Sequence, residues 1–320
     1  MLDDKAQEIL IITGATAVGK TSLALSLAER VGAEIVSADS LQVYRGMDIG
    51  SAKPSPAELA RVPHHGIDIS DPDQPFDLGK FLDLTRHTLS DIKQRGKRAI
   101  IVGGTGFYLN ALCRDFVPAL APSAEVKQRV LNLIASQPEA AWSQLAKVDP
   151  VSFERIEKND LYRLGRALEI WEATGQTMSQ VSSRSAPADS PFVLVSLQME
   201  KDVLQKHIET RVAAMFRAGL LAEVEGLLAK GYDKNLAALR AIGYKETIEF
   251  IEGGRKISEA ALGEKIVIHT RQLAKRQRTW FRQFKRDWPA DKFYELNVDG
   301  GISDDEILKI PGLRQRLHYY

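Results

Sequence analysis

The sequence of 320 residues is poor in cysteine, in net charge and in long apolar runs. With a single cysteine, Cys113, the chain can form neither an internal disulfide nor a multi-cysteine zinc site. The apolar residues around Cys113 predict a buried thiol without a catalytic role. The net charge of +1 gives no overall attraction to nucleic acid, so such binding would depend on local clusters among 43 basic residues. No apolar run approaches the length of a membrane span, and the acidic start lacks the layout of a secretory signal. We therefore expect a cytoplasmic protein without a membrane partner.

What the sequence does have is an alternation of apolar runs with helical patterns. Runs of the kind expected for strands buried on both faces of a parallel sheet lie at residues 9–13, 34–37, 99–102 and 192–197. Amphipathic stretches, such as residues 78–94, separate them. Strands that alternate with helices predict an α/β fold with a doubly wound parallel sheet.

The first apolar run leads directly into a glycine-rich turn with the spacing G-x-x-x-x-G-K-[ST], and a helical pattern follows at residues 22–30. In such a loop the backbone N–H groups converge on phosphate oxygens, the lysine adds positive charge, and the following helix presents its positive end. This order of strand, loop and helix predicts a core like that of P-loop NTPases. The predicted phosphate-binding residues are Gly14, Ala15, Thr16, Ala17, Val18, Gly19, Lys20 and Thr21, with Thr21 as a ligand of Mg²⁺, directly or through water.

Two further segments should face the same crevice, because ligands of doubly wound sheets gather at the carboxyl ends of the strands. Residues 38–40 follow the second predicted strand and residues 103–106 follow the third, which selects Asp39 and Thr105. A structural role as a cap is the alternative for both side chains, and an indirect contact with a bound magnesium ion is a further alternative for Asp39. Taken alone, the loop and Asp39 would suit a small-molecule kinase that holds ATP and uses Asp39 as the base.

The chain changes character at residue 118. Residues 118–191 are charged and helix-forming without a strand pattern, and prolines lie at both ends, which predicts an all-helical insertion. The predicted division is therefore residues 1–117 as the first part of the core, 118–191 as the insertion, and 192–320 as the completion of the core with basic C-terminal helices. Within the insertion, Arg163 and Arg166 share one helix face, where pairing with Glu169 or Glu172 is the simplest explanation.

Two clusters remain. His64 and His65 lie in a loop-like stretch with no third metal ligand at a suitable spacing, so a turn or packing role is expected. Residues 264–288 show an amphipathic helical pattern whose apolar stripe predicts a core-facing side. A solvated surface and a contact with nucleic-acid phosphates explain its basic face equally well. The basic residues of that face are Lys265, Arg271, Lys275, Arg276, Arg278, Arg282, Lys285 and Arg286.

Seven runs of the sequence together resemble the bacterial tRNA dimethylallyltransferases, also called tRNA isopentenyltransferases. They lie in the order of that family from about residue 14 to residue 282, and only the first would be specific alone. Ala15 departs from the family pattern, which usually has proline there, and only the loop backbone is affected. The runs are GATAVGKTSLA, SADSLQVYRGMDIGSAKP, DISDP, IIVGGTGFYLNAL, NDLYRLGRALE, RAIGYKE and TRQLAKRQRTWFR.

The resemblance implies transfer of a dimethylallyl group from dimethylallyl diphosphate to N6 of the adenosine immediately 3′ of the anticodon in tRNA. The loop would then hold the diphosphate leaving group, with Mg²⁺ as the cofactor. Asp39 would act as the base and Thr105 would orient the reacting atoms. Arg211, rather than Arg217, would stabilise the growing negative charge of the diphosphate.

The resemblance also implies how tRNA is held. The target adenine is stacked in the anticodon loop and must be flipped out to reach the crevice. No long coiled coil or exposed apolar repeat argues for an obligate dimer, so a monomer is expected. A P-loop kinase and a non-catalytic RNA-binding module are the alternatives. The implied tRNA-binding residues are Asp39, Ser40, Leu41, Gln42, Thr105, Lys127, Tyr162, Arg163, Leu164, Gly165, Arg166, Arg240, Ala241, Ile242, Gly243, Tyr244 and Lys245.

Overall fold

The computed structural model describes residues 8–114, 122–182, 190–301, 304–310 and 313 of the chain. The chain divides into two compact units, one formed by residues 1–110 and 188–320 and the other by residues 111–187. The predicted insertion at residues 118–191 corresponds to the second unit, but this unit starts earlier, inside helix α4 (Gly106–Cys113). The predicted boundary between residues 117 and 118 itself lies outside the described residues.

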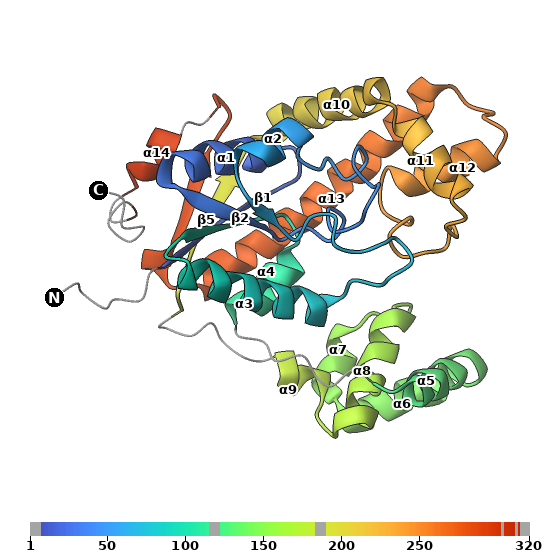
Figure 1. Cartoon of the computed structure of the whole chain (residues 1–320). Coiled ribbons are helices and arrows are strands. Elements are labelled where there is room, and N and C mark those ends of the chain that lie inside the picture. Colours follow the sequence, from blue (N-terminus) through green and yellow to red (C-terminus); the bar gives the residue numbers. More distant parts are fainter. Residues whose placement is uncertain (1–7, 115–121, 183–189, 302–303, 311–312, 314–320) are drawn as a thin grey trace. The chain divides into compact units, whose positions relative to one another are not determined.

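The first unit is built on a six-stranded sheet with the order β3-β2-β4-β1-β5-β6, in which all neighbouring strands are parallel (Figure 1). The predicted parallel sheet and its four strands are confirmed. Two edge strands were missed because one has only two residues and the other is half exposed, so neither forms a buried apolar run. The strands are β1 (Ile9–Gly14), β2 (Ala33–Ser37), β3 (His64–His65), β4 (Arg98–Val102), β5 (Phe192–Gln198) and β6 (Phe293–Asn297).

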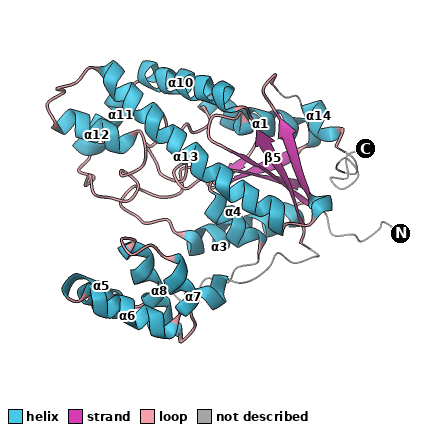
Figure 2. Cartoon of the chain, turned by 180° about the vertical axis from the view of Figure 1, so that it is seen from behind, coloured by secondary structure: helices cyan, strands magenta, loops and turns pink. Residues whose placement is uncertain are grey.

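Helices cover both faces of this sheet. Helix α1 (Lys20–Val31) connects β1 to β2, and α3 (Leu78–Gln94) connects β3 back to β4 in the opposite direction. Right-handed crossovers therefore place α1 and α3 on opposite faces, as Figure 2 shows. The other helices of this unit are α2 (Pro56–Arg61), α10 (Lys201–Ala218), α11 (Leu220–Ala229), α12 (Tyr244–Glu252), α13 (Glu259–Asp287), η1 (Ala290–Lys292) and α14 (Asp304–Leu308).

Helix α13 is the long amphipathic helix predicted from residue 264 onward. It begins earlier, at Glu259, because the Ser258 side chain accepts a hydrogen bond from the backbone N–H of Ala261 and so caps the helix. It packs against α10, α12 and β1. Its position beside β1 brings its middle turns close to the phosphate loop.

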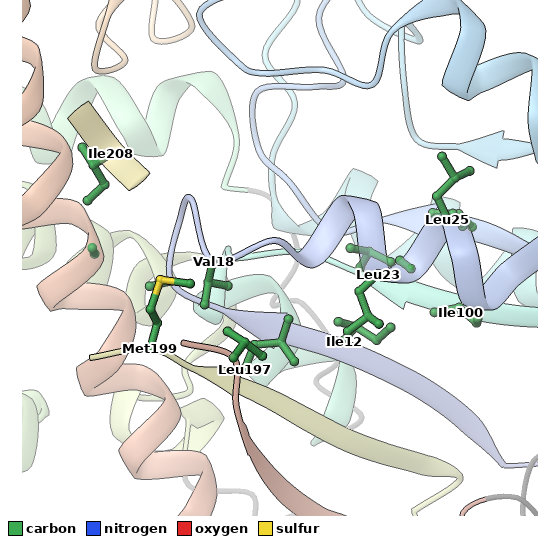
Figure 3. Packing of buried hydrophobic residues seen from close by; sticks show 14 of the residues in the cluster. Ile12, Val18, Leu23, Leu25, Ile100, Leu197, Met199 and Ile208 are labelled. Carbon is green, nitrogen blue, oxygen red and sulfur yellow. The ribbon is translucent and has the colours of Figure 1, made fainter. Parts of the chain in front are cut away.

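The glycine-rich loop is tied to the core at the end of β1. Gly14 has a φ of 145°, and a Cβ atom there would lie 2.7 Å from the carbonyl oxygen of Leu197. Val18 of the loop packs in the core beside Leu197 and Met199, as Figure 3 shows. Close packing against β5 therefore holds the loop and requires glycine at position 14.

The second unit contains only helices in its described part, as expected for the insertion. Its core is formed by residues that include Val130, Trp142, Leu145, Leu164 and Leu168. The unit therefore has its own hydrophobic core. Its helices are α5 (Ala124–Ser136), α6 (Pro138–Val148), α7 (Pro150–Arg155), α8 (Leu161–Thr174) and α9 (Met178–Ser182).

The adjacent histidines of β3 have local structural roles. His65 Nε2 lies 2.7 Å from Oε2 of Glu34, and His64 Nδ1 lies 2.7 Å from the carbonyl oxygen of Val62. Arg95 also donates to Glu34, with Nη2 2.8 Å from Oε2. The hydrogen bonds of Arg95, and to a smaller extent that of His65, lower the pKa of the nearly buried Glu34 carboxyl to about 2.

We expect Glu34→Gln to lower the free energy of unfolding by about 2 kcal/mol near neutral pH, because the charged hydrogen bonds to Arg95 are lost. A depressed folded-state pKa stabilises the protein above the unfolded value of 4.5, and this stabilisation disappears as the pH falls from 4.5 to about 2. Urea unfolding of both proteins across this range measures the difference, which should shrink with acidification. The exposed pair of Glu29 and Arg61 supplies the control, because Glu29→Gln should leave the unfolding curve unchanged.

In the described part of the chain, no helix combines the length and the apolar character that a membrane crossing requires.

Candidate active site

A cavity of about 440 Å³ lies where β1, β2 and β4 end, and the three segments predicted to share a crevice all line it. Lys20 comes from the loop after β1, Asp39 from the segment after β2, and Gly104 from the turn after β4. Helices α10 and α13 and residues 237–243 complete the wall. The fold therefore brings together a phosphate loop, a carboxylate and a backbone turn.

The loop and α10 form a cationic cradle at one side of the cavity. Helix α1 begins at Lys20, and its N-cap, Gly19, is left-handed and provides no side chain to cap the first N–H groups. The Lys20 ammonium donates to the carbonyl oxygens of Gly14 at 3.0 Å and Ala15 at 2.8 Å. From α10, Arg211 Nη1 donates to Thr16 Oγ1 at 3.1 Å. The N-terminus of α1 and two cationic side chains therefore lie together, an arrangement that suits an anion.

The two cations of the cradle, Lys20 and Arg211, repel each other, and both are largely removed from water. Part of the Lys20 side chain reaches solvent, but desolvation and, to a lesser extent, the Arg211 charge lower the pKa of its ammonium from 10.5 to about 7. Desolvation also lowers the pKa of Arg211. Asp39 opposes both shifts. The cradle thus holds positive charge that a bound anion would stabilise.

We expect diphosphate affinity to depend on the protonation of Lys20. The pKa of the Lys20 ammonium is about 7 without ligand, and a bound anion raises it. Between pH 6 and pH 8 the diphosphate affinity of the wild type should therefore fall by about tenfold more than the diphosphate affinity of Lys20→Met falls. Calorimetry with inorganic diphosphate in two buffers of different ionisation heat measures the affinity and the proton uptake. The variant serves as the control, because it retains only the ionisation of diphosphate itself. An equal pH dependence in both proteins would contradict the prediction.

Asp39 and Thr105 lie next to each other in the hydrogen-bond network. Asp39 Oδ1 accepts from the backbone N–H of Leu41 at 2.8 Å and of Gln42 at 3.4 Å. Thr105 Oγ1 accepts from the N–H of Ser40 at 3.3 Å. Oδ2 of Asp39 has no hydrogen-bond partner in the described part of the chain. One carboxylate oxygen thus caps the turn, and the other is available to act on a ligand.

The residues at this place fit a Mg²⁺ ion that binds together with a diphosphate. The Thr21 hydroxyl has no hydrogen-bond partner among the described residues, and Thr21 lines the cavity together with Asp39. Mg²⁺ favours one or two protein oxygens supplemented by phosphate oxygens and water. Within the described ranges, no group of three or more His, Cys, Asp or Glu side chains could hold a metal ion by itself. A ligand phosphate would therefore have to complete the coordination.

The segment before α12 lines the cavity, but Tyr244 does not. Its side chain is 0% exposed, and its hydroxyl donates to Oε1 of Glu223 at 2.8 Å. Glu223 also accepts from the backbone N–H groups of residues 48–50. The Tyr244 ring is therefore a core element that supports this turn, and the contact of Tyr244 with tRNA stays a prediction. Arg240 and Lys245 are exposed, and the cavity is lined by Arg240, Ala241, Ile242 and Gly243.

Among the other residues predicted to hold the base, Ser40, Leu41 and Gln42 line the cavity. The Gln42 amide is held in one orientation, because its Oε1 accepts from Ser37 Oγ at 3.0 Å and its Nε2 donates to the Ala52 carbonyl at 3.3 Å. A fixed amide of this kind presents a defined polar surface to a ligand.

Comparison with known proteins relates this site to one enzyme family. The IPP transferase family model matches residues 42–284, and the Isopentenyl transferase model matches residues 7–68. A tRNA dimethylallyltransferase 2 of Geotalea uraniireducens is 42% identical over 89% of this chain and 93% of its own length. The chain belongs to the IPP transferase family.

Solved structures of IPP transferases share this fold. The full-length tRNA isopentenylpyrophosphate transferase of Bacillus halodurans is 34% identical, with a TM-score of 0.68 over 98% of this chain and 97% of that protein. A eukaryotic dimethylallyltransferase acting on tRNA is 25% identical, with a TM-score of 0.80 over 97% of this chain and 77% of that protein. The predicted P-loop core and prenyltransferase activity are thereby confirmed in preference to the kinase.

In the helical unit of this IPP transferase, the predicted RNA contacts on α8 lie on two different faces of the helix. Tyr162 is 83% exposed, and Arg163 and Arg166 carry ion pairs with Asp160 at 3.2 Å and Glu169 at 3.1 Å. Lys127, on α5, is also exposed. The pairing of Arg166 with Glu169 agrees with the simplest explanation of that face.

Leu164 and Gly165 are buried on the inner face of α8, and their contacts with tRNA stay a prediction. Leu164 is fully buried in the core of the unit. A Cβ atom at Gly165 would lie 3.2 Å from Ile134 Cδ1. Helical periodicity turns these two positions inward when Tyr162, Arg163 and Arg166 face outward. Their role is helix packing.

One residue of the IPP transferase site was not predicted as functional. Gln277 lies in the stripe of α13 that was assigned to the core, and it lines the cavity. Its Oε1 accepts from the backbone N–H of Thr16 at 2.8 Å, and its Nε2 donates to the Gly104 carbonyl at 2.9 Å. A carboxamide within a mainly apolar helical stripe was the sequence signal for this role.

Proposed function

We propose that this IPP transferase moves the dimethylallyl group of dimethylallyl diphosphate to N6 of the adenosine immediately 3′ of the anticodon in tRNA and releases diphosphate. The observation that carries the proposal is that Lys20, Arg211 and Asp39 line the same cavity. A cationic cradle suits a departing diphosphate. A carboxylate oxygen without a hydrogen-bond partner in the described chain suits removal of a proton from the attacking nitrogen.

The bond that breaks joins the allylic carbon C1 to a diphosphate oxygen. Its electron pair moves to that oxygen, so negative charge grows on the diphosphate as the bond stretches. Loop N–H groups, Lys20 and Arg211 stabilise this charge, and they do so more strongly in a partly desolvated cavity than in water. When bound near Thr21, Mg²⁺ supplies further neutralisation of the same charge.

The bond that forms joins C1 to N6 of the adenine. N6 is a weak nucleophile because its lone pair is delocalised into the ring, so its proton must leave as the new bond forms. Asp39 Oδ2 takes this proton, while Oδ1 remains bound to the backbone of Leu41. Thr105 holds the N–H of Ser40 and thereby keeps the adjacent Asp39 in place. Solvent takes the proton from Asp39 after the products leave.

The nucleic-acid partner is the anticodon stem-loop of tRNA, with the target base flipped into the cavity. The exposed Arg240 and Lys245 beside the cavity wall and the exposed Lys127, Tyr162 and Arg163 of the helical unit support this assignment. Phosphate contacts of this type make binding weaker at high salt. We further propose that the protein acts as a monomer in the cytoplasm.

Mass spectrometry of tRNA nucleosides tests the function. Unmodified tRNA is incubated with the protein, Mg²⁺ and dimethylallyl diphosphate, and the expected product is adenosine that carries one dimethylallyl unit. A tRNA with another base at the position 3′ of the anticodon is the matched control and should remain unmodified. Absence of any prenylated nucleoside would refute the proposal. Release of ADP from ATP at a rate that depends on a metabolite would favour a kinase instead.

A further inference from the structure

Gln277 joins two parts of the site that come from distant places in the chain. Its Oε1 accepts a hydrogen bond from the backbone N–H of Thr16, which lies 261 residues earlier, in the phosphate loop. The Nε2 of Gln277 donates a hydrogen bond to the carbonyl oxygen of Gly104, which lies 173 residues earlier, in the turn after β4. One carboxamide of α13 therefore spans from the anion cradle to the turn that carries Thr105.

Helix α13 holds this turn at two points. A Cβ atom on Gly104 would lie 2.6 Å from Gln277 Nε2, and one on Gly106 would lie 2.7 Å from Trp280 Cβ. Gln277 and Trp280 are three residues apart and so lie on one face of the helix. Thr105 lies between the two glycines, and its position is set by this face of α13.

The other end of the bridge reaches the cradle itself. Thr16 gives its N–H to Gln277 and accepts the Arg211 guanidinium with its hydroxyl. Thr105 in turn accepts from the N–H of Ser40, next to Asp39. Within the described part of the chain, Gln277 is the side chain that hydrogen-bonds to both the loop and the turn.

We propose that Gln277 is a positioning residue that sets the spacing between the diphosphate cradle and the pair of Asp39 and Thr105. This inference rests on the proposed function. The spacing matters because that reaction requires the leaving group and the attacking nitrogen to be held in line. The fold does not depend on this side chain, because α13 also packs against α10, α12 and β1. Loss of the bridge should therefore change the alignment of the reactants more than the stability.

Gln277→Met tests this inference, because it keeps the length of the side chain and removes both hydrogen bonds. A displacement of about 1 Å between reacting groups costs about 100-fold in rate, so we expect kcat to fall by roughly 10- to 100-fold. The KM for tRNA should stay within about twofold of the wild-type value, since no interaction with RNA is removed. Gln272→Met is the matched control on an exposed face of the same helix and should behave like the wild type.

Gln277→Glu separates the two hydrogen bonds. It keeps an acceptor for the Thr16 N–H but places a carboxylate oxygen against the Gly104 carbonyl. Because its carboxylate adds negative charge beside the cradle, we expect its affinity for inorganic diphosphate, measured by calorimetry, to fall below that of Gln277→Met, with kcat also reduced. If Gln277→Met fails to fold in a thermal melt, this variant carries the test.

Two results would overturn the inference. One is a Gln277→Met protein whose kcat and KM values equal those of Gln272→Met. The other is a loss of tRNA affinity as large as the loss of kcat, which would make Gln277 an RNA contact. Failure of the proposed function is distinguishable from both, since it would appear as wild-type protein that makes no prenylated tRNA. The difference in diphosphate affinity between wild type and Gln277→Met would then still measure the tie to the loop.

Discussion

Asp39→Asn is expected to lower the rate of prenyl transfer by about a thousandfold, within the range that general-base catalysis contributes. The asparagine carbonyl can still accept the N–H of Leu41, so the turn after β2 is preserved. What disappears is the carboxylate oxygen that takes the N6 proton. Single-turnover measurements with saturating tRNA and dimethylallyl diphosphate measure this rate directly.

The structure supplies a matched control for this substitution. Asp83 is exposed on α3, so Asp83→Asn has the same chemistry at a place away from the cavity and should leave the rate unchanged. Filter binding of tRNA should give a wild-type affinity for Asp39→Asn. Turnover close to that of the wild type would remove Asp39 from the role of base and leave it as a cap of the turn.

Lys20→Met should abolish most of the transfer activity and at the same time stabilise the ligand-free protein. The ammonium is desolvated and lies near Arg211, which lowers its pKa to about 7, so the charged form costs folding free energy when no anion is bound. The same charge stabilises the departing diphosphate, and its removal should reduce kcat by about a hundredfold to a thousandfold. Thermal melts and steady-state kinetics measure the two effects.

The opposite signs of the two effects distinguish a functional lysine from a structural one. If Lys20 mainly holds the loop through the carbonyls of Gly14 and Ala15, then Lys20→Met lowers the melting temperature and the prediction is wrong. Lys97→Met is the control, because Lys97 is exposed, and it should change neither quantity. The site must stabilise negative charge that develops only during the reaction. Its positive charges are therefore unfavourable for folding when no ligand is bound.

Much of the site was predictable because its parts are local in sequence. The P-loop spacing, the buried strand before it and the helix after it are encoded within about 20 consecutive residues, as such motifs are. The places of Asp39 and Gly104 in the cavity wall were predictable because parallel strands end at one edge of the sheet, so two strand ends suffice to find the crevice. The resemblance to tRNA dimethylallyltransferases then assigned chemistry to these positions.

Three positions predicted to contact tRNA are buried for one physical reason. Tyr244, Leu164 and Gly165 lie within runs that resemble tRNA-contacting segments, but each run also packs on its own unit. Helical periodicity decides which members face inward, and the exact phase depends on neighbouring elements. The edge strands β3 and β6 were missed because strand identity there comes from pairing with β2 and β5 and not from an apolar run.

The sequence by itself determined the phosphate loop, the α/β class and the family, because each depends on short-range spacing or on runs of residues in a constant order. Only the tertiary structure decided which side chains meet. It placed Arg211 on Thr16, buried Tyr244 beneath the turn at residues 48–50, and brought Gln277 onto a loop 261 residues away. Contacts of this kind depend on how helices α10, α12 and α13 pack, and no local pattern in the chain encodes the distance between them.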